Sequence, residues 1–293
     1  MVSSSTQILI FACLIFLKIS PAVADDRKPP LLDCTSPGGA DARTVLASQK
    51  AWAKFLIEPS HEKSFTLDMT GKVTIDMILL PPGKYYRGDG DAARIITLKN
   101  PLWVGKYEVT QQQYEAVMGT NPSYFKRAGV DAALYPVETV SHDDATRFAT
   151  RASQNTGAEF RLLREAEWEY ACRAGTRTKF YNGDSNDTLG EIAHYYKKND
   201  SKGPEKVGGK KPNAFGLYDM AGNCWEWCSD WYADYDAITT DPRGPAFGSI
   251  RVNRGGSWGH SAQCCGAAYR HNDTPTRTSG GISLRLVRVP MWK

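Results

Sequence analysis

The pattern of apolar residues divides this 293-residue chain into an N-terminal apolar run, a helical segment and a long region of short runs. Residues 8–19 are apolar except for Lys18, a length typical of a secretory signal and below the ~20 residues of a membrane-spanning helix. Residues 21–24 supply a small-residue cleavage signal, so we expect residues 1–24 to be a signal peptide. Cys13 within this run permits a second interpretation, a lipid-attachment site that would anchor the chain. Both interpretations predict an exported protein, on the cell surface or secreted, with no direct membrane span.

A linker and one helix are expected next. Residues 25–40 are rich in proline and glycine, which is typical of a linker or tether. Asp41 is suited to cap a helix, and apolar residues then recur at three- and four-residue steps as far as Phe55. Pro59 ends this pattern. We therefore expect an N-terminal helical extension at residues 41–64.

From Phe65 the chain changes to short alternating runs separated by glycine and proline, which predicts strands at 65–67, 73–75 and 77–80. Two further helices are predicted at 110–118 and 145–155, the second opened by a capping box. Beyond Arg173 the sequence is rich in Gly, Asn, Asp and Pro but keeps several tryptophans. This combination indicates long loops that buried tryptophans hold in place; they are Trp225, Trp227, Trp231 and Trp258.

Composition and charge narrow the function classes. The 36 basic and 32 acidic residues are interspersed, and a formal charge of +4 gives no reason to expect a nucleic-acid or membrane-surface partner. The basic cluster formed by Lys197–Lys198 and Lys210–Lys211 is typical of a solvated loop. Cys224 and Cys228 have metal-like spacing but lack a second Cys/His pair, so a core or disulfide role is favoured over zinc. Six cysteines follow the expected signal peptide, and fifteen pairings remain open.

Four motifs follow one another along the remaining chain. They read PVExxS at 136–141, FRLLREAEWEYACR at 160–173, NAFGLYDMAGNCWEWCxDWY at 213–232 and RGGSW at 254–258. Together they resemble the formylglycine-generating enzyme, or sulfatase-modifying factor, family, which has a variant of the C-type lectin fold. The resemblance covers residues 65–289, so we expect one α+β domain of this fold at 65–293, loop-rich with short strands and a few helices.

The resemblance implies one structural metal. In family members a calcium ion sits in the loop of the third motif. Its ligands here would be the side chains of Asp219 and Glu226 and the carbonyls of Gly222 and Cys224, and all-oxygen ligation suits calcium. A second family calcium site uses an asparagine where this chain has His194, so we do not expect that second site here. No other cofactor is expected.

The family's oxidase chemistry is not expected. Family enzymes bind copper(I) through two cysteines, five apart, shortly after the Gly-Gly-Ser motif, where this chain has His260 and Cys265. Losing one thiolate removes the two-sulfur ligation that selects copper(I). Cys264 is adjacent to Cys265 and cannot replace it. We therefore predict that the protein is not an enzyme, with a formylglycine-generating-type oxidase acting on a protein cysteine as the alternative.

The C-terminal motif has a second resemblance, to the variable proteins of diversity-generating retroelements, which share this fold. There, adenine randomisation changes Asn codons to many residue types but never to Lys, Glu, Gln, Met or Trp. Those five types make up 51 of the 293 residues, so about four are expected in residues 259–281, where only Gln263 is found. The resemblance implies a variable region at about 254–288, with residues 254–258 and 282–288 as a constant frame.

The residues inside this frame suit recognition, because they mix hydrogen-bonding groups with a rigid aromatic ring. We therefore expect a binding protein, resembling a receptor or adhesin, whose partner is a protein or a cell-surface molecule. A structural subunit of an envelope complex is a further alternative. The candidate ligand-binding residues are Gly259, His260, Ser261, Cys264, Gly266, Ala268, Tyr269, His271, Asn272, Asp273, Thr276, Ser279, Gly280 and Gly281.

Overall fold

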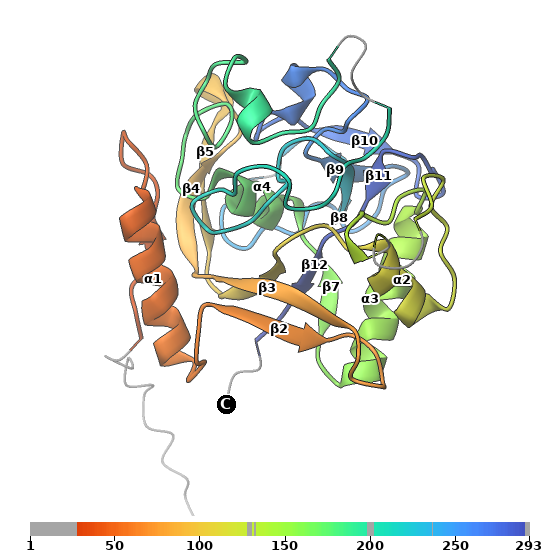
Figure 1. The fold of residues 1–293 in the computed structure, drawn as a ribbon. Coiled ribbons are helices and arrows are strands. Elements are labelled where there is room, and N and C mark those ends of the chain that lie inside the picture. Colours follow the sequence, from red (N-terminus) through yellow and green to blue (C-terminus); the bar gives the residue numbers. More distant parts are fainter. Residues whose placement is uncertain (1–27, 128–130, 132, 198–201, 236, 291–293) are drawn as a thin grey trace, which may run out of the picture.

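A computed structural model describes residues 28–127, 131, 133–197, 202–235 and 237–290 (Figure 1). The expected signal peptide lies outside these residues. Within them, three small β-sheets are combined with four α-helices, which confirms the predicted α+β class. None of the helices described is long and apolar enough to cross a bilayer.

A five-stranded antiparallel sheet contains both ends of the family-like region. Its order is β2-β3-β6-β12-β7, with β12 between β6 and β7 although it comes last in the chain. The strands expected at 65–67 and 73–75 correspond to the hairpin of β2 and β3. The strands are β2 (Glu62–Thr66), β3 (Thr74–Leu80), β6 (Leu102–Gly105), β7 (Phe160–Leu162) and β12 (Leu286–Arg288).

A four-stranded sheet carries the C-terminal motif. Its order is β10-β9-β8-β11, and β8 continues from the tryptophan-rich third motif. The strands are β8 (Trp225–Trp231), β9 (Arg251–Arg254), β10 (His271–Asp273) and β11 (Ile282–Ser283). The second half of the frame, at 282–288, thus contributes to two sheets: β11 pairs with β8, whereas β12 crosses to the five-stranded sheet. The buried Arg285 lies between the two strands, and its guanidinium binds Glu226.

The helices begin where their capping residues predict. Asp41 accepts from the Thr44 amide, and Thr110 and Ser141 each form a full capping box. Glycines in the left-handed conformation, Gly119 and Gly157, end two of the helices. The helices are α1 (Ala42–Phe55), α2 (Gln111–Met118), α3 (His142–Thr156) and α4 (Glu165–Arg173), and short 3₁₀ turns lie at Gly90–Ala92, Leu189–Glu191 and Ala262–Cys265.

The linker expected at 25–40 is wrong for its described C-terminal part. Strand β1 (Leu32–Asp33) pairs in parallel with β4 (Gly83–Arg87), which in turn pairs with β5 (Arg94–Leu98). Leu32 and Cys34 are buried because they pack in the same core as α4. Helix α1 is also joined to the domain, since the Gln49 amide donates to the carbonyls of Leu79 and Phe215. Part of the proline- and glycine-rich segment is therefore packed in the domain.

Candidate ligand-binding site

The segment between the two halves of the frame is held by its backbone. Its carbonyls accept hydrogen bonds from donors in the surrounding scaffold: Tyr196 N to His260 O (2.9 Å), His142 N to Pro275 O (3.0 Å), Thr139 N to Ser279 O (3.0 Å), Trp258 Nε1 to Gly280 O (2.9 Å) and Trp225 N to Gly281 O (2.8 Å). Arg254 adds a hydrogen bond to the carbonyl of Tyr269. Because backbone groups of the segment make these contacts, they can persist when its exposed side chains are exchanged.

The frame is buried and the interior is not. Residues 252–257 and 281–287 are all buried, whereas most of 258–280 is exposed or half-buried (blue in Figure 1). Among the predicted ligand-binding residues, four are exposed and eight are half-buried. The exposed ones are Gly259, His260, Ser261 and Thr276, and the half-buried ones are Cys264, Ala268, Tyr269, His271, Asn272, Asp273, Ser279 and Gly280.

Two predicted positions are buried. At Gly281 a Cβ would lie 3.1 Å from Ser257 Oγ, so a larger side chain there would press on the frame. Gly266 lies against Lys179, beside the buried Cys265 and Ala267, but a Cβ there would come no closer than 3.4 Å to its neighbours. Gly266 therefore has more room for exchange than Gly281.

Three predicted residues converge on one scaffold residue, Trp225. The His271 ring stacks on the indole at 4.9 Å between centroids, His260 meets it edge-on at 5.3 Å, and Tyr269 lies at 6.1 Å. Trp225 is only 2% exposed. The buried indole of Trp225 therefore packs beneath three partly exposed rings.

Hydrogen bonds fix the orientation of these rings. Trp225 Nε1 donates to His260 Nδ1 (3.3 Å), and Ser257 Oγ lies 2.7 Å from the same nitrogen. An indole only donates, so Nδ1 is an acceptor and the neutral ring carries its proton on Nε2. Burial and the nearby His271 lower the pKa of His260, which keeps the ring neutral at pH 7. A hydrogen bond with Cys264, together with burial, raises the pKa of Tyr269.

Strand pairing brings the polar part of the site together. His271 lies opposite Asn253 in the β9–β10 ladder, and its Nδ1 is 2.9 Å from Asn253 Oδ1. The Asn253 amide donates to Asp273 Oδ2 at 3.1 Å. His271 and Asp273 share one face of the strand because side chains alternate. Asn253 is fully buried, so it serves as a scaffold residue for two candidate binding residues.

A buried ionic network supports the segment from below. Glu165, Glu167 and Glu169 of α4 form ion pairs with arginines; Arg161 binds Glu167, and Arg173 binds Glu169. Arg254 also binds Glu169, and Arg270 binds Glu165 through Nε (2.6 Å) and Nη2 (2.9 Å). Bidentate pairs of this kind fix geometry as well as charge. Arg270 is thereby fixed between Tyr269 and His271.

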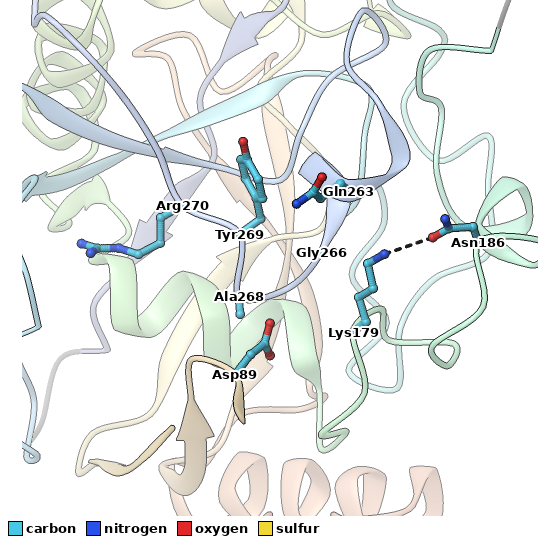
Figure 2. Close-up of a pocket in the computed structure, with 8 residues that line it drawn as sticks. All are labelled: Asp89, Lys179, Asn186, Gln263, Gly266, Ala268, Tyr269 and Arg270. Carbon is cyan, nitrogen blue, oxygen red and sulfur yellow. Dashed lines mark hydrogen bonds between the residues drawn. The ribbon is translucent and has the colours of Figure 1, made fainter. Parts of the chain in front are cut away.

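A cavity of about 640 Å³ opens beside the segment (Figure 2). Tyr269 and Arg270 diverge on one side, and Lys179 reaches toward Asn186 with an Nζ to Oδ1 distance of 3.1 Å. Predicted binding positions and scaffold residues line it jointly. The lining residues are Asp89, Lys179, Asn186, Gln263, Gly266, Ala268, Tyr269 and Arg270.

The positions of the family's thiol pair hold no activated cysteine. Cys265 is buried, and burial raises its pKa to about 12, so the thiolate that binds a soft metal is disfavoured. Its counterpart His260 is held by Trp225 and Ser257. All six cysteines of the described residues are unbridged, so none of the possible disulfide pairings is present among them.

The expected calcium ligands lie in a buried acidic cluster. Glu226 accepts from Arg285 and from Trp168 Nε1 (2.7 Å), and Asp219 accepts from the Gly208 amide (2.6 Å). Burial raises the pKa of Asp219 to about 6 and, with the charges of Asp219 and Glu226, raises the pKa of Glu108 well above its usual range. The carboxyl groups of Glu108, Asp219 and Glu226 thus lie near a single guanidinium, that of Arg285. A bound cation would reduce the excess of negative charge in this cluster. These carboxyl groups are not arranged to hold a metal ion by themselves, and no other group of three His, Cys, Asp or Glu side chains among the described residues is suited to one. A calcium ion here would therefore also need the carbonyls of Gly222 and Cys224.

Sequence reasoning missed Trp225, Asn253 and Phe125 as parts of the site. Phe125 packs edge-on against Trp258 at 5.5 Å and against Gly280. Nothing in the local sequence links residue 125 to the C-terminal motif. The signal available for Trp225 was only that of a core tryptophan.

The comparisons with known proteins agree with this architecture. Residues 65–290 match the family model of the sulfatase-modifying factor enzyme 1-like domain. The fold is that of the formylglycine-generating type of C-type lectin domain, as predicted. The chain belongs to the sulfatase-modifying factor enzyme 1-like family.

The proteins that this chain resembles differ in kind. The chain is 38% identical over 170 residues to the formylglycine-generating enzyme of Streptomyces coelicolor, a match covering 52% of each protein, so it spans about half the length of that relative. It is similar to Treponema denticola variable protein 1 with 31% identity and a TM-score of 0.71, covering 78% of this chain and 99% of that one. PvdO from Pseudomonas aeruginosa shares the fold, with a TM-score of 0.68 and 24% identity over 78% of this chain and 98% of that one. The predicted resemblance to variable proteins is confirmed.

Proposed function

We propose that this protein binds ligands through residues 259–280, and that these side chains are exchanged between copies of the gene while the scaffold stays constant. The observation that carries this proposal is the backbone attachment of the segment, which leaves most of its side chains on the surface. The similarity to a variable protein supports it. Binding energy would come from a few well-placed anchors, with Tyr269 and His271 over Trp225 at the centre.

Export belongs to the same proposal. A signal peptide at residues 1–24, or a lipid anchor at Cys13, would place the binding face outside the cytoplasm. The partner would then be a protein or another molecule of a cell surface.

The gene's neighbourhood tests the exchange of side chains. We expect a downstream repeat nearly identical to the codons of residues 254–288, differing only at adenines, next to a reverse transcriptase gene. Gene copies with unchanged codons at the exposed positions and changes scattered over the scaffold would contradict the proposal.

A display library tests binding itself. Randomising codons for exposed positions such as His260, Tyr269 and His271 should yield folded variants that bind different immobilised proteins. Transferring only these residues should transfer the specificity. A library that folds but never yields a specific binder would overturn the ligand-binding proposal.

The enzymatic alternative is tested with a cysteine-containing peptide, copper(I) and oxygen. We expect no peptide-dependent oxygen consumption above the protein-free background, because one thiol position holds His260 and the other holds a protonated Cys265. Turnover that Cys265→Ser abolishes would establish an oxidase instead.

A further inference from the structure

Two loops outside residues 259–281 border the candidate site with aromatic side chains. Tyr124 is 78% exposed, and its ring meets Phe125 edge-on at 5.0 Å; Phe125 in turn meets Trp258 at 5.5 Å. On another side of the site, Tyr196 is 51% exposed, and its backbone amide donates to the carbonyl of His260. These rings come from scaffold loops, so they would be present whatever residues the segment carries.

The same two loops carry exposed lysines. Lys126 follows Phe125, and Lys197 follows Tyr196. Lys202 precedes Gly203, where a Cβ would lie 2.8 Å from the Phe125 ring. All three lysines are exposed, and none of them has an ion-pair partner within 4.0 Å among the described residues.

Nearby acidic groups are already engaged. Glu138 is buried and accepts from the Phe125 amide and the Thr139 hydroxyl. Glu205 lies 3.2 Å from His194, and Asp273 accepts from Asn253. Glu205 is itself exposed, and His194 carries a charge only if protonated, so Glu205 offsets one of the three lysines. The exposed charge of the two loops is still mainly positive, although the chain as a whole carries only +4.

We propose that Tyr124, Lys126, Tyr196, Lys197 and Lys202 form a constant rim of the ligand site, and that this rim fits an acidic protein surface. This inference rests on the proposed function. Unpaired lysines attract carboxylates at long range and speed encounter, while exposed tyrosines supply anchoring area at low entropic cost. Every variant would share this weak, charge-dependent affinity, and the exchanged side chains would add specificity to it. Of the basic cluster singled out in the sequence, Lys197 thereby acquires a role.

The test uses a fluorescent oligoglutamate peptide as probe and the whole protein. The triple variant Lys126→Glu/Lys197→Glu/Lys202→Glu should weaken peptide binding at least about tenfold at low salt, and wild-type binding should weaken as salt rises. The matched control Lys54→Glu/Lys72→Glu/Lys99→Glu changes the net charge equally at exposed lysines elsewhere and should have little effect. Circular dichroism and melting temperature confirm that both variants fold.

Several outcomes separate the inference from the proposed function. Equal losses in both triple variants would show a net-charge effect and overturn the inference, as would no measurable peptide binding. Tighter binding of a heparin oligosaccharide than of oligoglutamate would replace the acidic protein by a sulfated glycan and also overturn it. If library-selected specificity transfers but the rim variant binds like wild type, the proposed function stands and the rim fails.

Discussion

Arg254 donates a hydrogen bond to the backbone carbonyl of Tyr269, fifteen residues further along the chain, while its guanidinium also binds the buried Glu169. One fully buried side chain thus joins the frame, helix α4 and the middle of the candidate binding segment. This relationship fixes the middle of the segment through its backbone, independently of the exposed side chains that it carries.

Replacing Arg254 should destabilise the whole domain. Arg254→Met leaves Glu169 without one of its two arginine partners in a buried setting, so we expect a loss of about 3–5 kcal/mol in the free energy of unfolding. Urea denaturation measures it. Arg151→Met, on the exposed face of α3, is the control and should change stability by less than about 0.5 kcal/mol. Similar effects of the two changes would refute the structural role of Arg254.

Mutation of the partly exposed rings should destabilise the fold less than mutation of Trp225, the buried residue beneath them. Changing His260, Tyr269 and His271 together to asparagine should cost less than about 2 kcal/mol, because the backbone contacts remain. Trp225→Ala removes a buried indole and should cost about 3–5 kcal/mol. Thermal and urea unfolding of both variants test this. A collapse of the triple variant would mean that the side chains, not the backbone, define the segment.

Stability should fall as the pH rises from about 4 to about 7. Burial raises the pKa of Asp230 from 3.8 to about 7, so its protonated form favours the folded state. Its stabilising effect is complete below pH 3.8 and is lost as the pH rises through the folded pKa. Asp230→Asn keeps an acceptor for the Glu165 amide and should flatten this dependence. Asp187→Asn, at an exposed site, should leave the profile unchanged.

Calcium should stabilise the protein if the acidic cluster holds it. Millimolar calcium chloride should then raise the melting temperature relative to EGTA, more at pH 7.5 than at pH 5, because the pKa of Asp219 is raised to about 6 and protonation competes with binding. Asp219→Ala should abolish the difference. A melting temperature insensitive to calcium at both pH values would show that protonation and Arg285 balance the cluster without a metal ion.

Local signals predicted much of the fold. Asp41, Thr110 and Ser141 marked helix starts because a capping side chain bonds to an amide two or three residues away. The linker prediction failed for the opposite reason. Leu32 and Cys34 are buried by pairing with a strand that begins at residue 83, and local composition carries no record of that partner.

The sequence by itself determined the family and the helix caps, since these depend on motifs and on interactions between near neighbours. Only the tertiary structure decided that Trp225 lies beneath His260, Tyr269 and His271, that Gly281 packs closely against Ser257, and that Tyr124 and Tyr196 border the site. The reason is physical. Burial and ring contacts form between residues tens to more than a hundred positions apart, and their geometry exists only once the sheets and loops have packed together.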